Sequence, residues 1–253
     1  MLANYIEPNW PAPKNVRALQ TTRLGGVSVF PFESLNLGAH VEDSEVNVRE
    51  NRKRLQELLP SAPLWLQQVH GTSLVTKQMG QRCPEADGSI TQKTNEVCTV
   101  MTADCLPVLL CDEAGTQVAA VHAGWRGLAD GILEEAVGQF KCSPDSILAW
   151  LGPAIGPNAF EVGKSVYDAF CSQNLLASGC FVKQVNQPNQ EYVGVLEKWH
   201  ADIYALAKLR LNSIGLSQVY GGDFCTYTDE ERFFSYRRDG KTGRMASCIW
   251  LTD

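Results

Sequence analysis

Short apolar runs, each about as long as a β-strand and bounded by turn residues, constrain the fold of this chain more than any other feature. They are "LWLQQVHG" (64–71), "VCTVMTADCLPVLLCD" (97–112), "TQVAAVHAG" (116–124) and "SILAWLGPAIG" (146–156). Runs of this kind, rich in Val and Leu, are typical of buried strands. None approaches the roughly 20 apolar residues that span a bilayer, so we expect them to form the core of a soluble protein.

Helical patterns lie between and after these runs. Segment 44–60 has Ser44 as a potential cap and Pro60 as a stop, and further helices are expected over 125–140, 165–173 and 196–215. Segments 218–228 and 232–251 are expected to be strands around a turn. Because strands and helices mix without strict alternation, the sequence predicts an α+β fold with mixed sheets flanked by helices. No linker-like tract interrupts it, so residues 1–253 are expected to form a single domain.

Charge and cysteine content exclude several classes of protein. The net charge of −6 argues against a nucleic-acid or anionic-membrane surface, which needs a concentrated positive field. The first residues lack the basic and apolar regions of a signal peptide, so a cytoplasmic location is expected. Nine cysteines, an odd number, argue against a disulfide framework. No pair has the CxxC spacing of zinc fingers or thioredoxins.

Three potential metal ligands stand near the ends of separate apolar runs. They are His70, Cys105 and His122, separated by 35 and 17 residues. Such gaps form no local metal motif but suit strands that converge in space. Two imidazoles and one thiolate match the ligand preference of zinc, and three protein ligands leave the open position of a catalytic site. Two alternatives remain: a core thiol beside hydrogen-bonded histidines, or a nucleophilic Cys105 activated by histidine.

Neighbouring residues suggest how such a centre is supported. Asp104 either orients one of the histidines or bonds to backbone at a strand end. Gly124 and Gly127 permit a tight strand-to-helix turn, and the helix that follows would direct free N–H groups toward His122, forming an anion pocket to which Arg126 adds charge. A simple packing turn is the alternative.

Arginines elsewhere in the chain are further candidates for anion contacts. Arg23 precedes a Gly-Gly turn, and the stretch "SYRRDGKTGR" ends in Arg244. Guanidinium groups suit phosphate or carboxylate. The candidate phosphate or substrate contacts are Arg23, Arg126, Arg237 and Arg238. A solvated basic turn is the alternative, and the better one for Lys241. Of the other histidines, His200 is expected to be structural, on a helix, whereas His40 can border a site.

A series of motifs runs in order from residue 21 to residue 251: "TTRxGGVS", "SLNLGxHV", "NRxRL", "QQVHG", "EADG", "TADCLPVLL", "AAVHAGWRG", "GPAIGPxxFEVG" and "SYRRDGxTGRMASxIWL". Together they resemble the bacterial polyphenol oxidoreductase (laccase-domain) family, also called purine nucleoside phosphorylase-like or peptidoglycan-editing-factor proteins. The resemblance implies zinc ligands at His70, Cys105 and His122. It also implies an α+β fold similar to that of a bacterial toxin deamidase, a cysteine hydrolase.

The activities that the resemblance implies differ in class. One is zinc-dependent phosphorolysis of adenosine, inosine, guanosine and methylthioadenosine, with deamination of adenosine. Others are copper-dependent phenol oxidation and a role in guarding peptidoglycan synthesis, for which a Cys105-dependent hydrolase is one form. A multicopper cluster needs many histidines, and the chain has four. We therefore expect a zinc enzyme acting on a purine nucleoside and inorganic phosphate, with copper, the cysteine hydrolase and a non-enzymatic metal-binding protein as alternatives.

Overall fold

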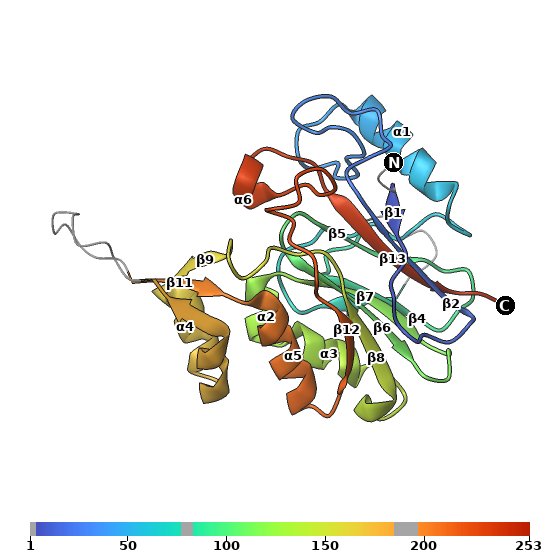
Figure 1. Ribbon diagram of the computed structural model, residues 1–253. Helices are drawn as coiled ribbons and strands as arrows, with labels where there is room; N and C mark the ends of the chain where they lie inside the picture. Colours follow the sequence, from blue (N-terminus) through green and yellow to red (C-terminus); the bar gives the residue numbers. More distant parts are fainter. Residues whose placement is uncertain (1–3, 77–82, 185–196) are drawn as a thin grey trace, which may run out of the picture.

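Two β-sheets form the centre of the molecule. The computed structural model describes residues 4–76, 83–184 and 197–253 (Figure 1). The antiparallel four-stranded sheet has the order β1 (Tyr5–Ile6), β2 (Val16–Thr21), β13 (Met245–Leu251), β5 (Cys98–Thr102). The six-stranded sheet has the order β12 (Gln218–Gly221), β8 (Ile147–Leu151), β6 (Leu106–Asp112), β7 (Val118–Ala123), β4 (Gly88–Thr91), β3 (Leu74–Val75). It is mixed, because β12–β8 and β3–β4 are parallel and its other pairs are antiparallel.

A smaller sheet and several helices complete the fold. The antiparallel three-stranded sheet has the order β10 (Phe181–Lys183), β11 (Lys198–Ala201), β9 (Glu161–Gly163). The α-helices are α1 (Glu45–Gln56), α2 (Trp125–Asp130), α3 (Ile132–Gly138), α4 (Lys164–Cys171), α5 (Ile203–Ser213) and α6 (Tyr236–Asp239). The 3₁₀ helices are η1 (Pro144–Ser146) and η2 (Leu175–Cys180). The prediction of an α+β fold with mixed sheets and flanking helices is confirmed.

Alternation along the central strands creates the layers. In β6, Val108 packs toward helices, whereas Leu109 points to the opposite face and packs with residues of the four-stranded sheet, such as Val100 and Ile249. The two large sheets therefore lie face to face, with their apolar side chains between them. On the outer face of the four-stranded sheet, Leu55 of α1 contributes to a separate apolar cluster.

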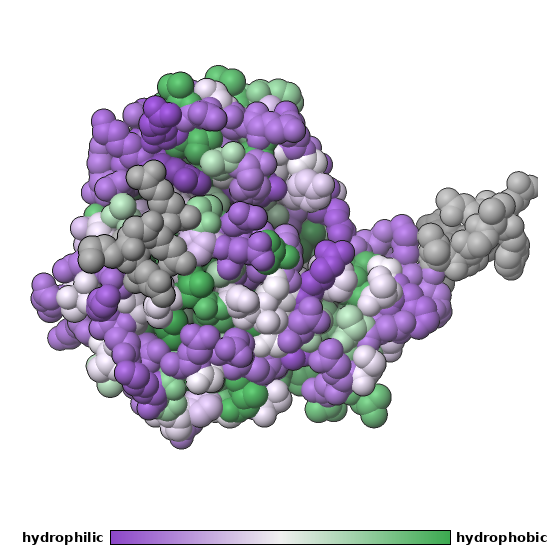
Figure 2. Space-filling view, turned by 180° about the vertical axis from the view of Figure 1, so that it is seen from behind, coloured by the Kyte–Doolittle hydropathy of each residue, from purple (hydrophilic) through white to green (hydrophobic). Residues whose placement is uncertain are grey.

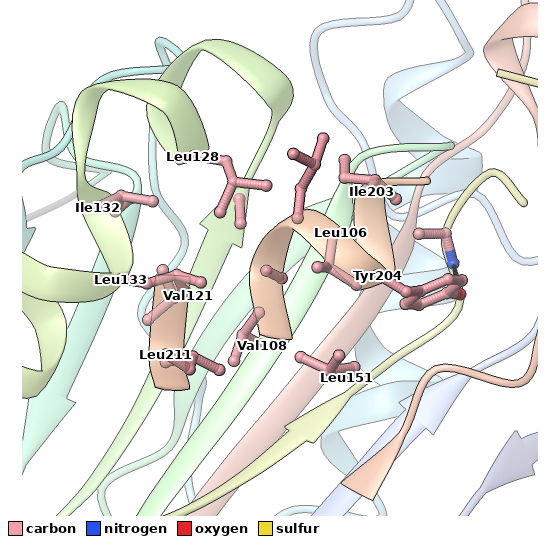
Figure 3. Packing of buried hydrophobic residues seen from close by; sticks show 14 of the residues in the cluster. Leu106, Val108, Val121, Leu128, Ile132, Leu133, Leu151, Ile203, Tyr204 and Leu211 are labelled. Carbon is pink, nitrogen blue, oxygen red and sulfur yellow. Dashed lines mark hydrogen bonds between the residues drawn. The ribbon is translucent and has the colours of Figure 1, made fainter. Parts of the chain in front are cut away.

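The helical layer on the six-stranded sheet is drawn in Figure 3, where strand side chains meet those of three helices. The contacting residues are Leu106, Val108, Val121 and Leu151 from the sheet, Leu128 from α2, Ile132 and Leu133 from α3, and Ile203, Tyr204 and Leu211 from α5. All are buried. Hydrophilic residues cover most of the face seen in Figure 2, with hydrophobic ones scattered between them. No helix of the described residues is long and apolar enough to cross a membrane.

Several expected boundaries were wrong. The helix expected over 125–140 is two helices, because Gly131 has φ 101°, a left-handed conformation that ends α2. The run 97–112 is two strands in different sheets, separated by a turn in which Asp104 has φ 89°. In each case one residue with positive φ interrupts a pattern that is otherwise continuous.

Other elements differ in type. The run 64–71 forms only isolated bridges through Leu64 and Gln67. Instead of one helix over 196–215, the described part of that segment is β11 followed by α5, so His200 lies on a strand; residue 196 is outside the described residues. Asp202 separates the two by capping α5, accepting a hydrogen bond from the backbone N–H of Ala205. Segment 232–251 contains the short helix α6 before β13.

Candidate metal centre

Strand pairing brings the predicted ligands to one end of the six-stranded sheet. Leu106 pairs with Ala123, so Cys105, which precedes β6, lies beside the end of β7 that carries His122. Gly88 pairs with Val121, so Asp87, which precedes β4, lies beside the same residue. Three segments far apart in sequence therefore meet at one point, and a loop ending in His70 joins them.

The donor atoms form a close triangle. One ligand atom from each of His70, Cys105 and His122 lies within 4.8 Å of the others. Cys105 Sγ is 3.8 Å from His70 Nε2, and the two imidazole rings meet edge to face with centroids 4.8 Å apart. His70 is exposed, Cys105 half-buried and His122 buried, so the triangle is open to solvent on one side. The three residues expected from sequence are thus brought together.

The donor set fits a metal ion with nitrogen and sulfur preference. With bonds of about 2.0–2.3 Å, tetrahedral zinc places its ligand atoms about 3.3–3.8 Å apart. Small side-chain rotations would close the remaining distance. Because only three side chains supply ligand atoms, an ion held here would keep a fourth position for another ligand. Among the described residues this is the one group of three or more His, Cys, Asp or Glu side chains positioned to hold an ion.

Asp87, which the sequence analysis missed, orients the centre. Its Oδ1 accepts a hydrogen bond from His122 Nδ1 at 2.8 Å and from the backbone N–H of His70 at 2.9 Å. Its Oδ2 accepts from the N–H groups of Gly71 at 2.7 Å and Val69 at 3.2 Å. A fully buried carboxylate thus holds one imidazole ring and the backbone of the loop that carries the other. It stands in the "EADG" motif, but no local spacing indicated its role.

Asp104 does not orient a histidine. Its carboxylate accepts hydrogen bonds from Thr226 Oγ1 and from the backbone N–H of Arg237, both at 2.6 Å. Asp104, with its positive φ, lies in the turn between the two sheets, and the hydrogen bonds of its carboxylate go to Thr226 and Arg237 instead of an imidazole. Of the two roles considered from sequence, the backbone contact is the one observed, and it ties α6 to the residue next to Cys105.

The thiol and the buried imidazole favour their charged forms together. Burial raises the pKa of Cys105, but the charge of His122 and hydrogen bonds from both histidines outweigh it and lower that pKa to about 6. Burial lowers the pKa of His122, but the thiolate and the hydrogen bond to Asp87 raise it to about 9. A thiolate is the form that binds metal and the form that acts as a nucleophile.

The glycines of "HAGWRG" are needed for close approach. A Cβ on Gly124 would lie 2.7 Å from His70 Cδ2 and 3.3 Å from Cys105 Sγ. A Cβ on Gly127 would lie 2.6 Å from the carbonyl oxygen of Gly71. Gly124 has φ −61°, which any residue adopts, so lack of space rather than backbone conformation requires glycine there. The start of α2 therefore packs directly against the three donor side chains.

Backbone carbonyl groups accept hydrogen bonds from three candidate arginines, to different extents. Arg23 donates from Nε to Glu33 O and from Nη1 to Glu230 O. The guanidinium of Arg237 donates from Nη1 to Ala159 O and Glu161 O.

Every nitrogen of the Arg238 guanidinium is engaged. It donates to Asp239 and to the carbonyls of Thr226, Tyr227 and Phe233. Arg126 is exposed and lies over the Trp125 ring at 4.4 Å. The assignment of these four arginines to phosphate stays a prediction.

Lys241, His200 and His40, the other basic residues considered from sequence, differ in their surroundings. Lys241 is exposed and pairs with Glu42 at 2.8 Å, and His200 contacts Gln184 in the small sheet. His40 is different: burial lowers its pKa first, and the charges of Arg244 and Arg52 lower it further. His40 therefore lies in a positive field.

A cysteine between two imidazoles, one of them held by a buried carboxylate and all at one end of a sheet, is an arrangement that could hold a metal ion. Comparison with known proteins places the chain in a family. The chain belongs to the family described as multi-copper polyphenol oxidoreductase laccase, whose sequence model matches residues 17–252. The resemblance seen in the motifs is thereby confirmed.

Full-length relatives carry a different name. A protein of Escherichia coli (strain K12) named purine nucleoside phosphorylase YfiH is 54% identical over 99% of this chain and 100% of its own length. A Haemophilus influenzae protein named purine nucleoside phosphorylase is 49% identical over 97% of this chain and 98% of its own.

Solved structures share the fold. A Neisseria meningitidis protein superposes with a TM-score of 0.90 at 48% identity, covering 99% of this chain and 100% of its own. YlmD from Geobacillus stearothermophilus superposes with a TM-score of 0.85 at 29% identity, covering 100% of this chain and 98% of its own. The likeness to a toxin deamidase stays a prediction from the resemblance.

Proposed function

We propose that this chain is a zinc-dependent purine nucleoside enzyme that cleaves adenosine, inosine, guanosine and methylthioadenosine with inorganic phosphate and deaminates adenosine. The observation that carries the proposal is the meeting of His70, Cys105 and His122 donor atoms within 4.8 Å at an open surface. The full-length relatives named purine nucleoside phosphorylase support the choice of substrate.

In the proposed site, His70, Cys105 and His122 would hold the zinc ion. A zinc ion there would supply an activated water for deamination and would stabilise developing negative charge. The chain's own residues prepare that site. Asp87 accepts a hydrogen bond from His122 Nδ1 and so fixes the ring, which leaves the lone pair of Nε2 to bind metal. Gly124 leaves space for all three ligand side chains.

Phosphorolysis requires a phosphate held in line with the bond that breaks. A phosphate oxygen bonds to ribose C1′ while the bond from C1′ to the purine nitrogen breaks, and the departing base takes up a proton. Positioning and charge stabilisation supply most of such catalysis. We place the phosphate near the start of α2, beside the donor triangle. However, α2 has six residues instead of the longer helix expected, so its dipole contributes little and arginine must supply most of the binding.

A cysteine hydrolase is the second candidate, and one observation favours it. Asp87, His122 and Cys105 follow one another as carboxylate, imidazole and thiolate, the order of a nucleophilic triad. Such an enzyme could act on peptidoglycan precursors. The placement of His70 Nε2 3.8 Å from the same sulfur favours a metal, because a triad needs one imidazole and a metal site uses both.

Copper chemistry and a purely metal-binding role are less well supported. The family's description fits a copper oxidase. A multicopper cluster needs many histidines, and of the four in this chain His40 and His200 lie outside the donor triangle. A single copper at the same three residues stays an alternative to zinc.

The test combines metal analysis with product analysis. We expect one zinc per chain, and strongly weakened binding in Cys105→Ala. A nucleoside screen with and without phosphate should give free base and ribose 1-phosphate only when phosphate is present. Phosphate-independent release of free ribose refutes phosphorolysis, and a covalent adduct on Cys105 trapped during turnover favours the hydrolase. Zinc without turnover of any nucleoside indicates the accessory protein.

A further inference from the structure

Arg244 comes close to the metal centre through the four-stranded sheet. In that sheet Met245 of β13 pairs with Thr102 of β5, so the residue before β13 stands opposite the segment in which β5 runs into Asp104 and Cys105. Burial lowers the pKa of the Arg244 guanidinium, and the nearby groups that oppose this lowering most are Cys105 and then Asp104. The register of two strands therefore brings this arginine to the donor triangle.

Contacts with residues 36–38 hold Arg244 in its position. Its backbone N–H donates to Asn36 Oδ1 at 2.9 Å, and its carbonyl accepts from the N–H of Leu37 at 3.1 Å. Its stem passes over Gly38, where a Cβ would lie 2.8 Å from Arg244 Cγ. The "LNLG" segment thus leaves room for the side chain and holds its backbone.

Two of the three guanidinium nitrogens of Arg244 have no hydrogen-bond partner in the described part of the chain. Nη1 donates to the carbonyls of Thr242 and Gly243 at 2.9 and 3.0 Å. Among the described residues, Nε and Nη2 have no hydrogen-bond acceptor and no carboxylate forms an ion pair with this side chain. Arg244 is only half-buried, so these two donors remain accessible to an acidic ligand, whose oxygens match the geometry of the guanidinium. The buried hydroxyl of Thr242 also has no partner among the described residues.

Positive charge accumulates around this group although the chain is acidic overall. Arg52, half-buried over the Trp65 ring at 4.0 Å, also forms no ion pair among the described residues. Burial lowers the pKa of His40, and the positive charges of Arg244 and Arg52 lower it further. Close to Arg244, the exposed ring of Tyr236 has its centroid 5.9 Å from the guanidinium carbon and offers a flat surface beside it. The Arg244 guanidinium is suited to bind an anion, and the Tyr236 ring beside it is suited to stack on an aromatic ring of a ligand.

We propose that Arg244 is the principal phosphate-binding residue of this site, with its free Nε and Nη2 donors directed to the anion and with Arg52 adding positive charge nearby. This assignment rests on the proposed phosphorolysis. It differs from the four arginines expected from sequence. Arg23 and Arg238 each donate from more than one guanidinium nitrogen to backbone carbonyls. Arg237 lies against the Phe160 ring and the carbonyls on either side of it, and Arg126 lies over the Trp125 ring. Two charge-assisted hydrogen bonds from Arg244, one from Nε and one from Nη2, would hold the phosphate that the short helix α2 binds only weakly by itself.

The test measures inorganic phosphate binding and catalysis separately, on the metal-loaded protein. Phosphate should raise the melting temperature of the parent protein. Arg244→Gln should raise the dissociation constant for phosphate about 10- to 100-fold, the usual loss for a charge-assisted bond, and raise the KM for phosphate equally. The KM for nucleoside should change far less. Arg244→Lys, which keeps the charge and loses the fork, should restore part of the affinity and guards against misfolding of the glutamine variant.

Lys241→Gln is the matched control, because Lys241 is three residues away, carries the same charge and pairs with Glu42. It should bind phosphate like the parent. Equal phosphate affinity in the parent, Arg244→Gln and Arg244→Lys overturns the assignment, and so does absence of phosphate binding to the parent. Release of free ribose by the parent without phosphate overturns the proposed function instead, so the two failures are distinguishable.

Discussion

Replacing Asp87 with asparagine should damage both stability and metal affinity, because one buried carboxylate organises the centre. Each carboxylate oxygen accepts two hydrogen bonds: Oδ1 from His122 Nδ1 and the His70 N–H, Oδ2 from the N–H groups of Gly71 and Val69. An asparagine has one oxygen, so its NH₂ group faces two of these donors in either orientation. Two bonds are lost when it faces Gly71 and Val69, and when it faces His122 and His70 one is lost and the other forms only if His122 changes tautomer.

The magnitude follows from that count. A hydrogen bond to a charged group contributes about 1.5–3 kcal/mol, so two lost bonds amount to about 3–6 kcal/mol. Burial of the charge, the largest single influence on the pKa of Asp87, opposes its ionised form. Removing the charge therefore relieves part of the loss, and we expect a net decrease in the free energy of unfolding of about 2–4 kcal/mol. Domains are stable by about 5–15 kcal/mol, so the variant should still fold.

Metal affinity should fall as well. When the asparagine NH₂ faces His122, the ring must accept at Nδ1 and carry its proton on Nε2, which removes the lone pair that binds metal. Loss of such an orienting partner typically costs about 10- to 100-fold in affinity. Urea unfolding gives the stability change, and competition with a chelator gives the zinc affinity.

Asp112→Asn is the matched control. Asp112 is also buried and accepts hydrogen bonds from the N–H groups of Thr116 and Gln117, but it lies at the end of β6 away from Cys105. It should lose stability and keep its zinc affinity. An Asp87→Asn protein with the stability and zinc affinity of the parent would refute the reasoning.

Three further outcomes are expected. In metal-free protein, iodoacetamide should modify Cys105 at neutral pH, and the reaction should slow as the pH falls through about 6, because the lowered pKa of Cys105 keeps it a thiolate above that pH. Burial raises the pKa of Cys98 and Cys248 to about 12, so these two thiols should stay unmodified. Peptide mapping by mass spectrometry measures the modification of each cysteine, and added zinc should protect Cys105. Gly124→Ala should abolish zinc binding by forcing a Cβ against His70, and zinc uptake equal to the parent's contradicts this. Tyr204→Phe should lower the free energy of unfolding by about 1–3 kcal/mol, because the buried hydroxyl bonds Ala154 N–H and Phe224 O; an unchanged urea midpoint counts against it.

Sequence alone identified the donor set and the class of fold. Successive side chains of a strand point to opposite faces, and the runs 106–112 and 118–123 are apolar almost throughout, so both faces of each strand are apolar. This pattern indicates strands buried between two layers. The positions of His70, Cys105 and His122 in such runs made them candidates, with a core thiol and hydrogen-bonded histidines as the alternative, and the motif resemblance selected them as the predicted ligands. Element boundaries were harder to predict, since single residues with positive φ, Asp104 and Gly131, interrupt continuous patterns.

Tertiary structure decided which groups serve the donors. Asp104 adjoins Cys105 in sequence, yet Asp87 holds His122, because the register of β4 against β7 places Asp87 across from it. In the same way, the pairing of β13 with β5 brings Arg244 to the centre across more than half of the chain. Strand register depends on the packing of whole sheets, not on local spacing. The chain therefore encodes its reactive atoms locally and their supporting partners only through the fold.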